Sequence, residues 1–309
     1  MVSWIIIGRD WERNYNQLFD CIRKQTAPKD QYEIIFVDDY SSDNSYEILK
    51  IYAKANNFTA LKTKSNRGRG AARNLGINKA KGKWCIFTNS NTYPTSNFIS
   101  NYLKRINDSD CDILAGRINY SCPQDKAFEL YLNHEKRGIN QVKDDNPVPI
   151  KFILFGNCAI KKIYLSKFQF DESIFLYGGE ELELLLRITK KEKVKALKVN
   201  STVLRSHHPS LNNHCERMVE FGYNLNHYYD KKLVQRIIPR KILFVLKYVP
   251  ITKLIYMLNK VYYILPHRHV IKVIVGLHII KGVYSKKYYK SYCPESKSSD
   301  VATSHSESL

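Results

Sequence analysis

The chain has 309 residues, which is enough for one large domain with an appendage or for two modest domains, and its 44% hydrophobic content is ordinary for a globular protein with a buried core. Its formal net charge of +20 is unusual and mostly local. Residues 231–290 hold 14 Lys or Arg and no Asp or Glu, whereas the rest of the chain has 35 basic and 29 acidic side chains.

The seven cysteines are scattered, odd in number and without a CxxC pair. This pattern argues against a disulfide framework or a zinc cluster and favours a reducing compartment. The apolar start of the chain, residues 1–8, is short and has no basic leader or cleavage site. It is therefore predicted to be a first strand and not a signal peptide, and a cytoplasmic location is expected.

The first ninety residues alternate between short apolar runs, typical of buried parallel strands, and segments with helical spacing. The predicted strands are 2–7, 32–37, 59–63 and 84–87, and the predicted helices are 14–25, 45–55 and a third that ends near residue 80. This alternation predicts a doubly wound parallel sheet, which binds ligands at the carboxyl ends of its strands. Asp38, Asp39 and Asn89 are expected at such ends.

The alternation is looser from residue 110 to residue 210. Strands are predicted at 112–119 and 152–160, a helix at 180–190, and a last pair of strands at 194–199 and 202–206. The segment from Glu295 onward is rich in serine and poor in apolar residues, so it is predicted to be disordered.

A pair of carboxylates, Asp38 and Asp39, follows the second predicted strand in the run 37–43. Carboxylates at a strand end can accept a hydrogen bond from a base or a ribose, or help to hold a metal. Acidic and serine residues are also favoured before a helix, so N-capping of the helix 45–55 explains the same residues. The pattern alone favours neither explanation.

A glycine- and arginine-rich segment, residues 66–76, precedes the third helix. Its glycines allow a close approach of the backbone, and its arginines are suited to phosphate or ribose, Arg73 above all. Solvated arginines in front of a helix are the alternative.

Two further polar segments follow. The fourth strand ends in Asn89, Ser90 and Asn91, and residues 178–183 place Glu180 and Glu181 directly after a Gly-Gly turn. A carboxylate there can take a proton from an attacking hydroxyl, although glutamates at a helix start are also favoured by the helix dipole.

These segments, in this order, resemble the family 2 glycosyltransferases of the GT-A fold over roughly residues 1–215. The matching motifs are VDDxSxD, N-x-G-x-x-x-A-R-N-x-G, the DxD segment and G-G-E-D-x-E-L. The resemblance implies a mixed, mainly parallel α/β sheet flanked by helices and an inverting transfer from a nucleotide sugar. It places Asp38 or Asp39 at the nucleobase and Arg73 at the ribose or phosphate.

The resemblance also implies that the loop of Asn89, Ser90 and Asn91 lies at the donor diphosphate, and that Glu181 is the base, with Glu180 as the second candidate catalytic residue. The family's two DxD aspartates, which hold Mg²⁺ or Mn²⁺, are replaced by asparagines. Because hard divalent cations prefer charged oxygens, metal affinity is expected to fall steeply.

Three explanations of the asparagines stay open. Other groups hold the metal, with Asn91, His207 and His208 as the candidate ligands; or Lys and Arg neutralise the diphosphate; or the chain is a catalytically inactive relative. His207 and His208 also fit a pair of surface histidines before Pro209. A CMP-activated donor, and a non-catalytic scaffold that binds nucleotide sugars or a membrane, are the alternative functions.

The basic C-terminal region has apolar stretches interrupted by Lys241, Lys247, Lys253 and Lys260, none of them long enough to span a bilayer. Basic amphipathic helices at an anionic membrane surface fit this pattern, and a helical subdomain that covers the sheet is the alternative. Nucleic acid is not an expected partner, because the segment is too apolar and has no base-reading motif.

The predicted organisation is therefore a GT-A domain at 1–225, a basic helical segment at 226–292 and a disordered tail at 293–309. The expected partners are a nucleotide-sugar donor, a glycan or lipid-linked acceptor, and the inner face of the membrane. Bacterial capsule or O-antigen assembly is the setting that the resemblance implies.

Overall fold

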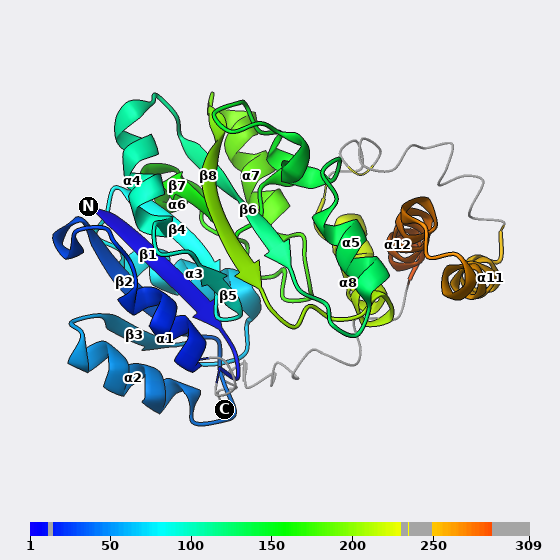
Figure 1. Cartoon of the computed structure of the whole chain (residues 1–309), viewed down its shortest axis with the longest axis horizontal. Coiled ribbons are helices and arrows are strands. Elements are labelled where there is room, and N and C mark those ends of the chain that lie inside the picture. Colours follow the sequence, from blue (N-terminus) through cyan, green and yellow to red (C-terminus); the bar gives the residue numbers. More distant parts are fainter. Residues whose placement is uncertain (12–14, 230–233, 235–248, 286–309) are drawn as a thin grey trace, which may run out of the picture.

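The computed structural model describes residues 1–11, 15–229, 234 and 249–285, and its centre is one eight-stranded sheet with helices on both faces (Figure 1). The strand order is β3-β2-β1-β4-β7-β6-β8-β5. The strands are β1 (Val2–Gly8), β2 (Tyr32–Asp38), β3 (Thr59–Lys62), β4 (Trp84–Asn89), β5 (Thr92–Pro94), β6 (Ile113–Tyr120), β7 (Cys158–Lys161) and β8 (Ala196–Arg205).

The amino-terminal half of the sheet is parallel, which confirms the predicted α/β architecture. β1 pairs in parallel with both β2 and β4, with Gly8 opposite Asp38 and Ile7 opposite Asn89. The carboxyl ends of β2 and β4 therefore lie at one edge, as expected from the sequence. β7 is antiparallel to β4 and β6, so the whole sheet is mixed.

Most of the described helices cover the two faces of the sheet, and the last two lie beyond it at one end of the molecule (Figure 1). The described helices are α1 (Tyr15–Arg23), α2 (Ser45–Ala55), α3 (Gly68–Lys79), α4 (Phe98–Asp108), α5 (Lys126–Asn133), α6 (Lys162–Phe168), α7 (Glu180–Lys191), α8 (Leu211–Tyr228), α11 (Ile251–Ile264) and α12 (Arg268–Val283), with the short 3₁₀ turns η1 (Lys29–Gln31), η2 (Gly138–Gln141) and η3 (Ile150–Phe152).

Both faces of β1 are buried, which explains its uninterrupted apolar run. Trp4 and Ile6 belong to a core shared with α1, α2 and α4, whereas Ile5 and Ile7 belong to the opposite core, shared with α3, α6 and α7. Successive strand residues point to opposite faces, so a strand covered on both sides needs apolar residues at every position.

The structure corrects two of the strand predictions, one for a single strand and one for a pair of strands. The segment predicted as a strand at 152–160 begins as η3 and a turn, closed by a 3.0 Å hydrogen bond from the Asn157 N–H to the Leu154 carbonyl, and only β7 is extended. The predicted strand pair at 194–199 and 202–206 is the single strand β8. β6 pairs in parallel with β8 along its length, with a shift in register between Ala115 and Arg117. β8 therefore continues as one strand where a turn between two strands was predicted.

The C-terminal helix α12 packs directly on α8 and buries Ile271, Ile274 and Leu277. The predicted domain boundary at residue 225 falls inside α8. The predicted tail at 293–309, and residues 230–233, 235–248 and 286–292 of the basic segment, lie outside the described residues. Within the described part of the chain, no helix combines the length and the apolar character that crossing a bilayer requires.

The contact between α8 and α12 depends on glycines. A Cβ atom on Gly282 would lie 2.0 Å from the Val219 carbonyl oxygen, and one on Gly222 would lie 1.9 Å from the Ile279 carbonyl oxygen. Only glycine lets the two backbones approach this closely.

We expect Gly282→Ala to lower the free energy of unfolding by about 1–3 kcal/mol, because the added methyl group forces the two helices apart. Gly276→Ala, in the same helix, is the matched control, since a Cβ there has no neighbour within 4 Å. Its higher helix propensity should raise stability by up to ~1 kcal/mol. Urea denaturation measures both, and equal effects of the two substitutions would contradict this account of the contact.

Candidate active site

A cavity of about 300 Å³, called here the central cavity, opens at the carboxyl ends of the strands. Its lining brings together Asn89 from the end of β4, Glu181 from the first turn of α7 and Arg205 from the end of β8. Met218 of α8 and Val275 of α12 also line it, so the C-terminal helices form part of its wall.

Two adjacent glutamates, Glu180 and Glu181, begin α7 directly after a Gly-Gly turn and have different surroundings. Gly178 and Gly179 have φ values of +80° and +101°, which side chains with a Cβ rarely adopt. The Glu180 carboxylate is buried and pairs with Arg69 and Arg73, each at 3.0 Å. Burial alone would raise the pKa of Glu180, but these two guanidinium groups outweigh it and hold that pKa below its ordinary value.

The Glu181 carboxylate, in contrast, lines the central cavity. One oxygen lies 2.5 Å from Nη2 of Arg73, and the other accepts a 3.1 Å hydrogen bond from the Phe155 N–H. Asn89 is close by, since its Nδ2 lies 3.3 Å from the position that a Cβ of Gly156 would take. The structure thus brings Glu181 to one cavity with Asn89, the first residue of the loop of Asn89, Ser90 and Asn91, which is called here the asparagine loop.

Arg73 lies behind the cavity wall. Its side chain is 0% exposed, sits 5.3 Å from the ring centroids of both Phe155 and Phe170, and forms ion pairs with Glu180 and Glu181. This differs from the placement expected at the donor. A direct contact with ribose or phosphate would require Arg73 to break these pairs, and the described geometry makes it the group that positions the two glutamates.

The two aspartates after β2 have different surroundings. Both carboxylate oxygens of Asp38 bind Ser41, one of them to its N–H at 3.1 Å, so Asp38 holds the turn. Asp39 is buried, and its Oδ1 has no hydrogen-bond partner among the described residues. Burial raises the pKa of Asp39 despite nearby Arg9, Arg69 and Arg73. Neither aspartate caps α2, where Asp43 accepts a 3.0 Å hydrogen bond from the Ser45 N–H.

The asparagine loop follows β4 as a tight turn. The Asn89 N–H donates to Oγ1 of Thr92 at 3.0 Å, while the Asn89 side-chain oxygen is buried without a partner in the described structure. Ser90 is buried, with its N–H bound to the Ile7 carbonyl at 2.8 Å, and Asn91 is partly exposed.

The two histidines after β8 point to different surroundings. His208 lines the central cavity and is packed against Tyr120 and His214, with both ring nitrogens unpartnered in the described structure. Burial, then the charge of Arg205, lowers the pKa of His208 to about 2. His207 is exposed, with φ +52°. The two histidines do not converge on one point.

The donor atoms present do not fit a site for a hard divalent cation. No group of three His, Cys, Asp or Glu side chains is placed to hold a metal in the ranges that the structure describes. The charged oxygens that Mg²⁺ and Mn²⁺ prefer are represented in the cavity lining by Glu181 alone, which is paired with Arg73, and the other candidate ligands there are the Asn89 amide and the His208 imidazole.

Several cavity residues carry no signal in the sequence. Arg137, Lys151 and Arg205 line the central cavity, and no described carboxylate forms an ion pair with them. Tyr177 lies between two cations, with Arg69 at 4.5 Å and Arg217 at 5.2 Å from its ring centroid. Burial would raise the pKa of Tyr177, but the surrounding arginines, Arg205 foremost, lower it overall.

The family model described as "Glycosyl transferase family 2" matches residues 5–167, more than half of the chain. The chain therefore belongs to glycosyl transferase family 2. The poly(ribitol-phosphate) beta-glucosyltransferase of Bacillus spizizenii is 35% identical over 119 residues, which are 38% of this chain and 19% of that protein. Glycosyltransferase AglE of Haloferax volcanii is 28% identical over 123 residues, 40% of either chain. The matches thus span well under half the length of these relatives.

Solved structures share the fold. Residues 1–349 of Staphylococcus aureus TarS, in complex with UDP, superpose with a TM-score of 0.57 at 16% identity, over 92% of this chain and 90% of that one. The mannosyltransferase PcManGT of Pyrobaculum calidifontis, in complex with GDP-Man and Mn²⁺, gives a TM-score of 0.61 at 14% identity, over 91% and 86%. The GT-A-type fold expected from the sequence is confirmed.

The buried His214 beside the cavity should make stability depend on pH. Its burial, reinforced by Arg137 and Arg205, lowers its pKa from 6.5 to about 3. Between these values the unfolded chain binds a proton that the folded chain does not, so stability falls as pH drops below 6.5.

Below pH 6.5, the free energy of unfolding of the wild type should fall by about 1.4 kcal/mol per pH unit through His214, and we expect His214→Phe to remove this part of the fall. The measurement is the free energy of unfolding of both proteins between pH 6.5 and 4. His207→Asn, an exposed histidine whose positive φ suits asparagine, is the control. Parallel pH curves for wild type and His214→Phe would show that His214 is protonated in the folded protein.

Proposed function

We propose that this protein is an inverting glycosyltransferase that moves a sugar from a nucleoside diphosphate sugar to a hydroxyl group of a glycan acceptor. The observation that carries the proposal is the Glu181 carboxylate, held at the wall of the central cavity by Arg73 and the Phe155 N–H, with the loop after β4 beside it. Family membership and the glycosyltransferases among its relatives support the same activity.

Two observations support a nucleoside diphosphate sugar as the donor: the ligands of structurally similar proteins, and the side chains at the carboxyl ends of the parallel strands. TarS binds UDP and UDP-GlcNAc, and PcManGT binds GDP-Man. In this chain, the ends of β1, β2 and β4 form the corresponding edge, where the unpartnered Oδ1 of Asp39 is suited to a base or ribose donor group. A nucleoside diphosphate sugar therefore fits better than a CMP-activated one.

In the proposed reaction, Glu181 accepts the proton of the acceptor hydroxyl as its oxygen attacks the anomeric carbon. The bond from that carbon to the donor phosphate breaks, and the nucleoside diphosphate leaves with the bonding electrons. Because attack and departure occur on opposite faces, the configuration inverts. Glu180 does not take part, since it is buried against Arg69 and Arg73.

We further propose that Arg205 replaces part of the metal's role at the leaving diphosphate. Arg205 lies opposite Thr92 in the sheet, and Thr92 is three residues after Asn89 in the chain. No described carboxylate forms an ion pair with Arg205. A guanidinium group can bind phosphate oxygens by two parallel hydrogen bonds. A carboxylate at position 89 could compete for Arg205, whereas the neutral Asn89 leaves the guanidinium charge available to a phosphate.

The test combines binding and turnover. We expect Glu181→Gln to bind the nucleotide like wild type but to lose about 10²–10⁴-fold in turnover, since the amide cannot take the proton. Thermal stabilisation by UDP and GDP, each with Mn²⁺ or EDTA, measures binding, and a ligand at 100 times its Kd should add ~2.7 kcal/mol. Release of UDP or GDP from the sugar nucleotide measures turnover.

Glu180→Gln is the contrasting variant, because it weakens the pairing of the buried Arg73 and the partly exposed Arg69 and should lower stability. Stabilisation that survives EDTA supports the role proposed for Arg205, whereas strict dependence on Mn²⁺ contradicts it. If no sugar nucleotide stabilises the protein or is turned over, the chain is a non-catalytic relative.

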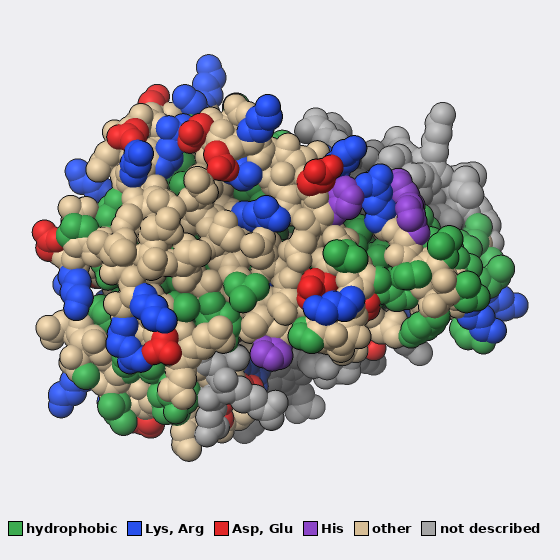
Figure 2. Space-filling view, in the orientation of Figure 1, with side chains coloured by type: hydrophobic (Ala, Val, Ile, Leu, Met, Phe, Trp, Pro, Cys, Tyr) green, Lys and Arg blue, Asp and Glu red, His purple; other side chains and the backbone are tan. Residues whose placement is uncertain are grey.

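We also propose that α11 contacts an anionic membrane, which would bring the enzyme to a lipid-linked acceptor in bacterial cell-surface polysaccharide synthesis. Hydrophobic side chains gather over α11 at the right edge of Figure 2. Those exposed include Tyr256, Met257, Tyr263 and Ile264, and Lys253 and Lys260 are exposed on the same helix. Apolar and basic groups together favour the interface of an anionic bilayer.

We expect Ile264→Glu to reduce sedimentation of the protein with phosphatidylglycerol vesicles several-fold, because a carboxylate replaces an apolar group at the lipid surface. Ile264 is 85% exposed, and Ile51 of α2, at 70%, is the matched position for the control Ile51→Glu. The same loss with both variants, or none with either, would remove α11 from the proposal.

A further inference from the structure

A second cavity of about 240 Å³, called here the side cavity, adjoins the central cavity between β6, η2 and η3. The two cavities share six lining residues: Ile118, Tyr120, Leu132, Arg137, Lys151 and Leu154. Asn89, Glu181 and Arg205 line only the central cavity. A molecule that reaches from Glu181 into the side cavity therefore passes Arg137 and Lys151.

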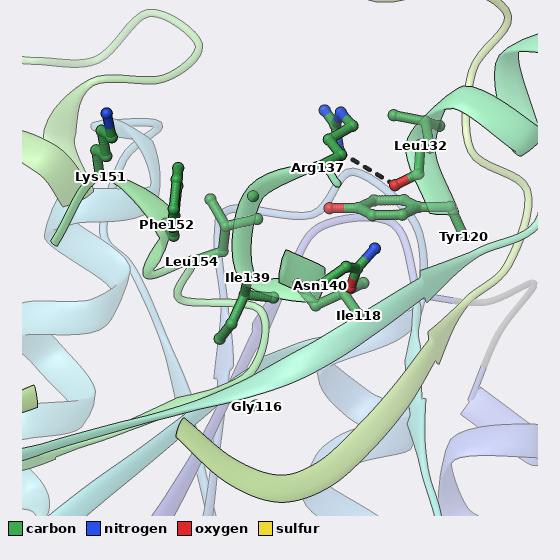
Figure 3. Close-up of a pocket in the computed structure, with 11 residues that line it drawn as sticks. Gly116, Ile118, Tyr120, Leu132, Arg137, Ile139, Asn140, Lys151, Phe152 and Leu154 are labelled. Atoms are coloured by element: carbon green, nitrogen blue, oxygen red, sulfur yellow. Dashed lines mark hydrogen bonds between the residues drawn. The ribbon is translucent and has the colours of Figure 1, made fainter. Parts of the chain in front are cut away.

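The inner surface of the side cavity is largely apolar. Figure 3 shows Ile118, Ile139 and the ring of Tyr120 around it, with Phe152 and Leu154 on the adjacent wall. Apolar surfaces of this kind suit the face of a sugar or polyol that is formed by its C–H groups. The asparagine loop, which lies at the proposed donor site, does not reach it, so the side cavity is on the acceptor's path.

The charged side chains that line the side cavity are all positive. No Asp or Glu lines it, whereas Arg137 and Lys151 do. Nη1 of Arg137 donates to the Leu132 carbonyl at 3.3 Å, and its guanidinium lies 5.0 Å from the Tyr131 ring centroid. The Lys151 ammonium lies 5.3 Å from the Phe152 ring centroid. These contacts orient both cations without neutralising them, and no described carboxylate pairs with either.

Other cations of the domain differ in this respect. Arg69 lines the central cavity but is paired with Glu180, Arg73 behind the wall is paired with Glu180 and Glu181, and Lys161 is paired with Asp112 at 2.8 Å. Two unneutralised cations beside an apolar hollow attract an anionic ligand, because charge-assisted hydrogen bonds are the strongest that a protein offers. The ligand they fit carries an anionic group next to an apolar ring or chain.

We propose that the side cavity binds an anionic group of the acceptor, carried by a unit next to the one that presents the attacking hydroxyl. The acceptor is then an acidic glycan or polyol chain, whose anionic oxygens come from a phosphodiester or from a sugar carboxylate. This inference rests on the proposed sugar transfer and names the class of its acceptor.

The test measures binding without turnover, in the full chain saturated with UDP, so that the donor site is filled. The probes are a glycerol-phosphate oligomer, an oligogalacturonate and a neutral malto-oligosaccharide, titrated by calorimetry. We expect one or both anionic probes to bind at least about tenfold more tightly than the neutral one, a difference of ~1.4 kcal/mol. Preference between the two anionic probes identifies phosphate or carboxylate as the source.

Lys151→Met and Arg137→Met should each weaken the anionic probe about tenfold and leave the neutral probe unchanged. Lys136→Gln, an exposed cation one residue from Arg137 that lines neither cavity, is the control for long-range charge and should change affinity less than twofold. Lys151 is exposed, so its variant is expected to fold even if Arg137→Met does not.

Equal binding of all three probes, or anion binding that survives Lys151→Met, would overturn the inference. These outcomes are separate from a failure of the proposed function. Transfer to neutral acceptors with no anion preference would refute only the side-cavity assignment, whereas anion binding without any turnover would refute only the transferase.

Discussion

The site depends on one buried interaction, the guanidinium of Arg73 held between Glu180 and Glu181. A buried charge is costly unless it is fully paired, and removing one partner of such a group typically costs several kcal/mol. Arg73 therefore ties α3 to the first turn of α7 and, together with the Phe155 N–H, holds the Glu181 carboxylate at the cavity. Gly178 and Gly179, with positive φ values, form the turn that leads into α7, and the two glutamates follow as its first residues.

The electrostatics of the cavity are arranged around arginine and lysine. The Asn89 amide at the end of β4 lines the central cavity, and Arg205, Arg137 and Lys151 line the same cavity without acidic partners among the described residues. A site of this kind suits ligands that bring their own negative charge, such as the donor diphosphate and the acidic acceptor that we propose. Burial, and after it the charge of nearby arginines, lowers the pKa of both His208 and His214, so the protonated form of these rings is disfavoured.

The C-terminal helices connect the site to the surface. α12 packs on α8 through glycines, and the two helices contribute Met218 and Val275 to the central cavity. α11, which packs on α12, exposes the apolar side chains of Tyr263 and Ile264. The segment is therefore both a wall of the site and an exposed amphipathic surface, and the two explanations weighed from the sequence do not exclude each other.

The sequence by itself determined the parallel first half of the sheet, because buried strands and amphipathic helices leave a local periodic pattern. It also placed the aspartates and Asn89 at one edge, and two glutamates after a glycine turn. Only the tertiary structure decided which glutamate faces the cavity, that Arg73 is buried, and that Arg137, Lys151 and Arg205 share the site. Those outcomes depend on contacts between residues far apart in the chain, such as Arg73 with Glu181, and no local pattern encodes which of several arginines is enclosed by the fold.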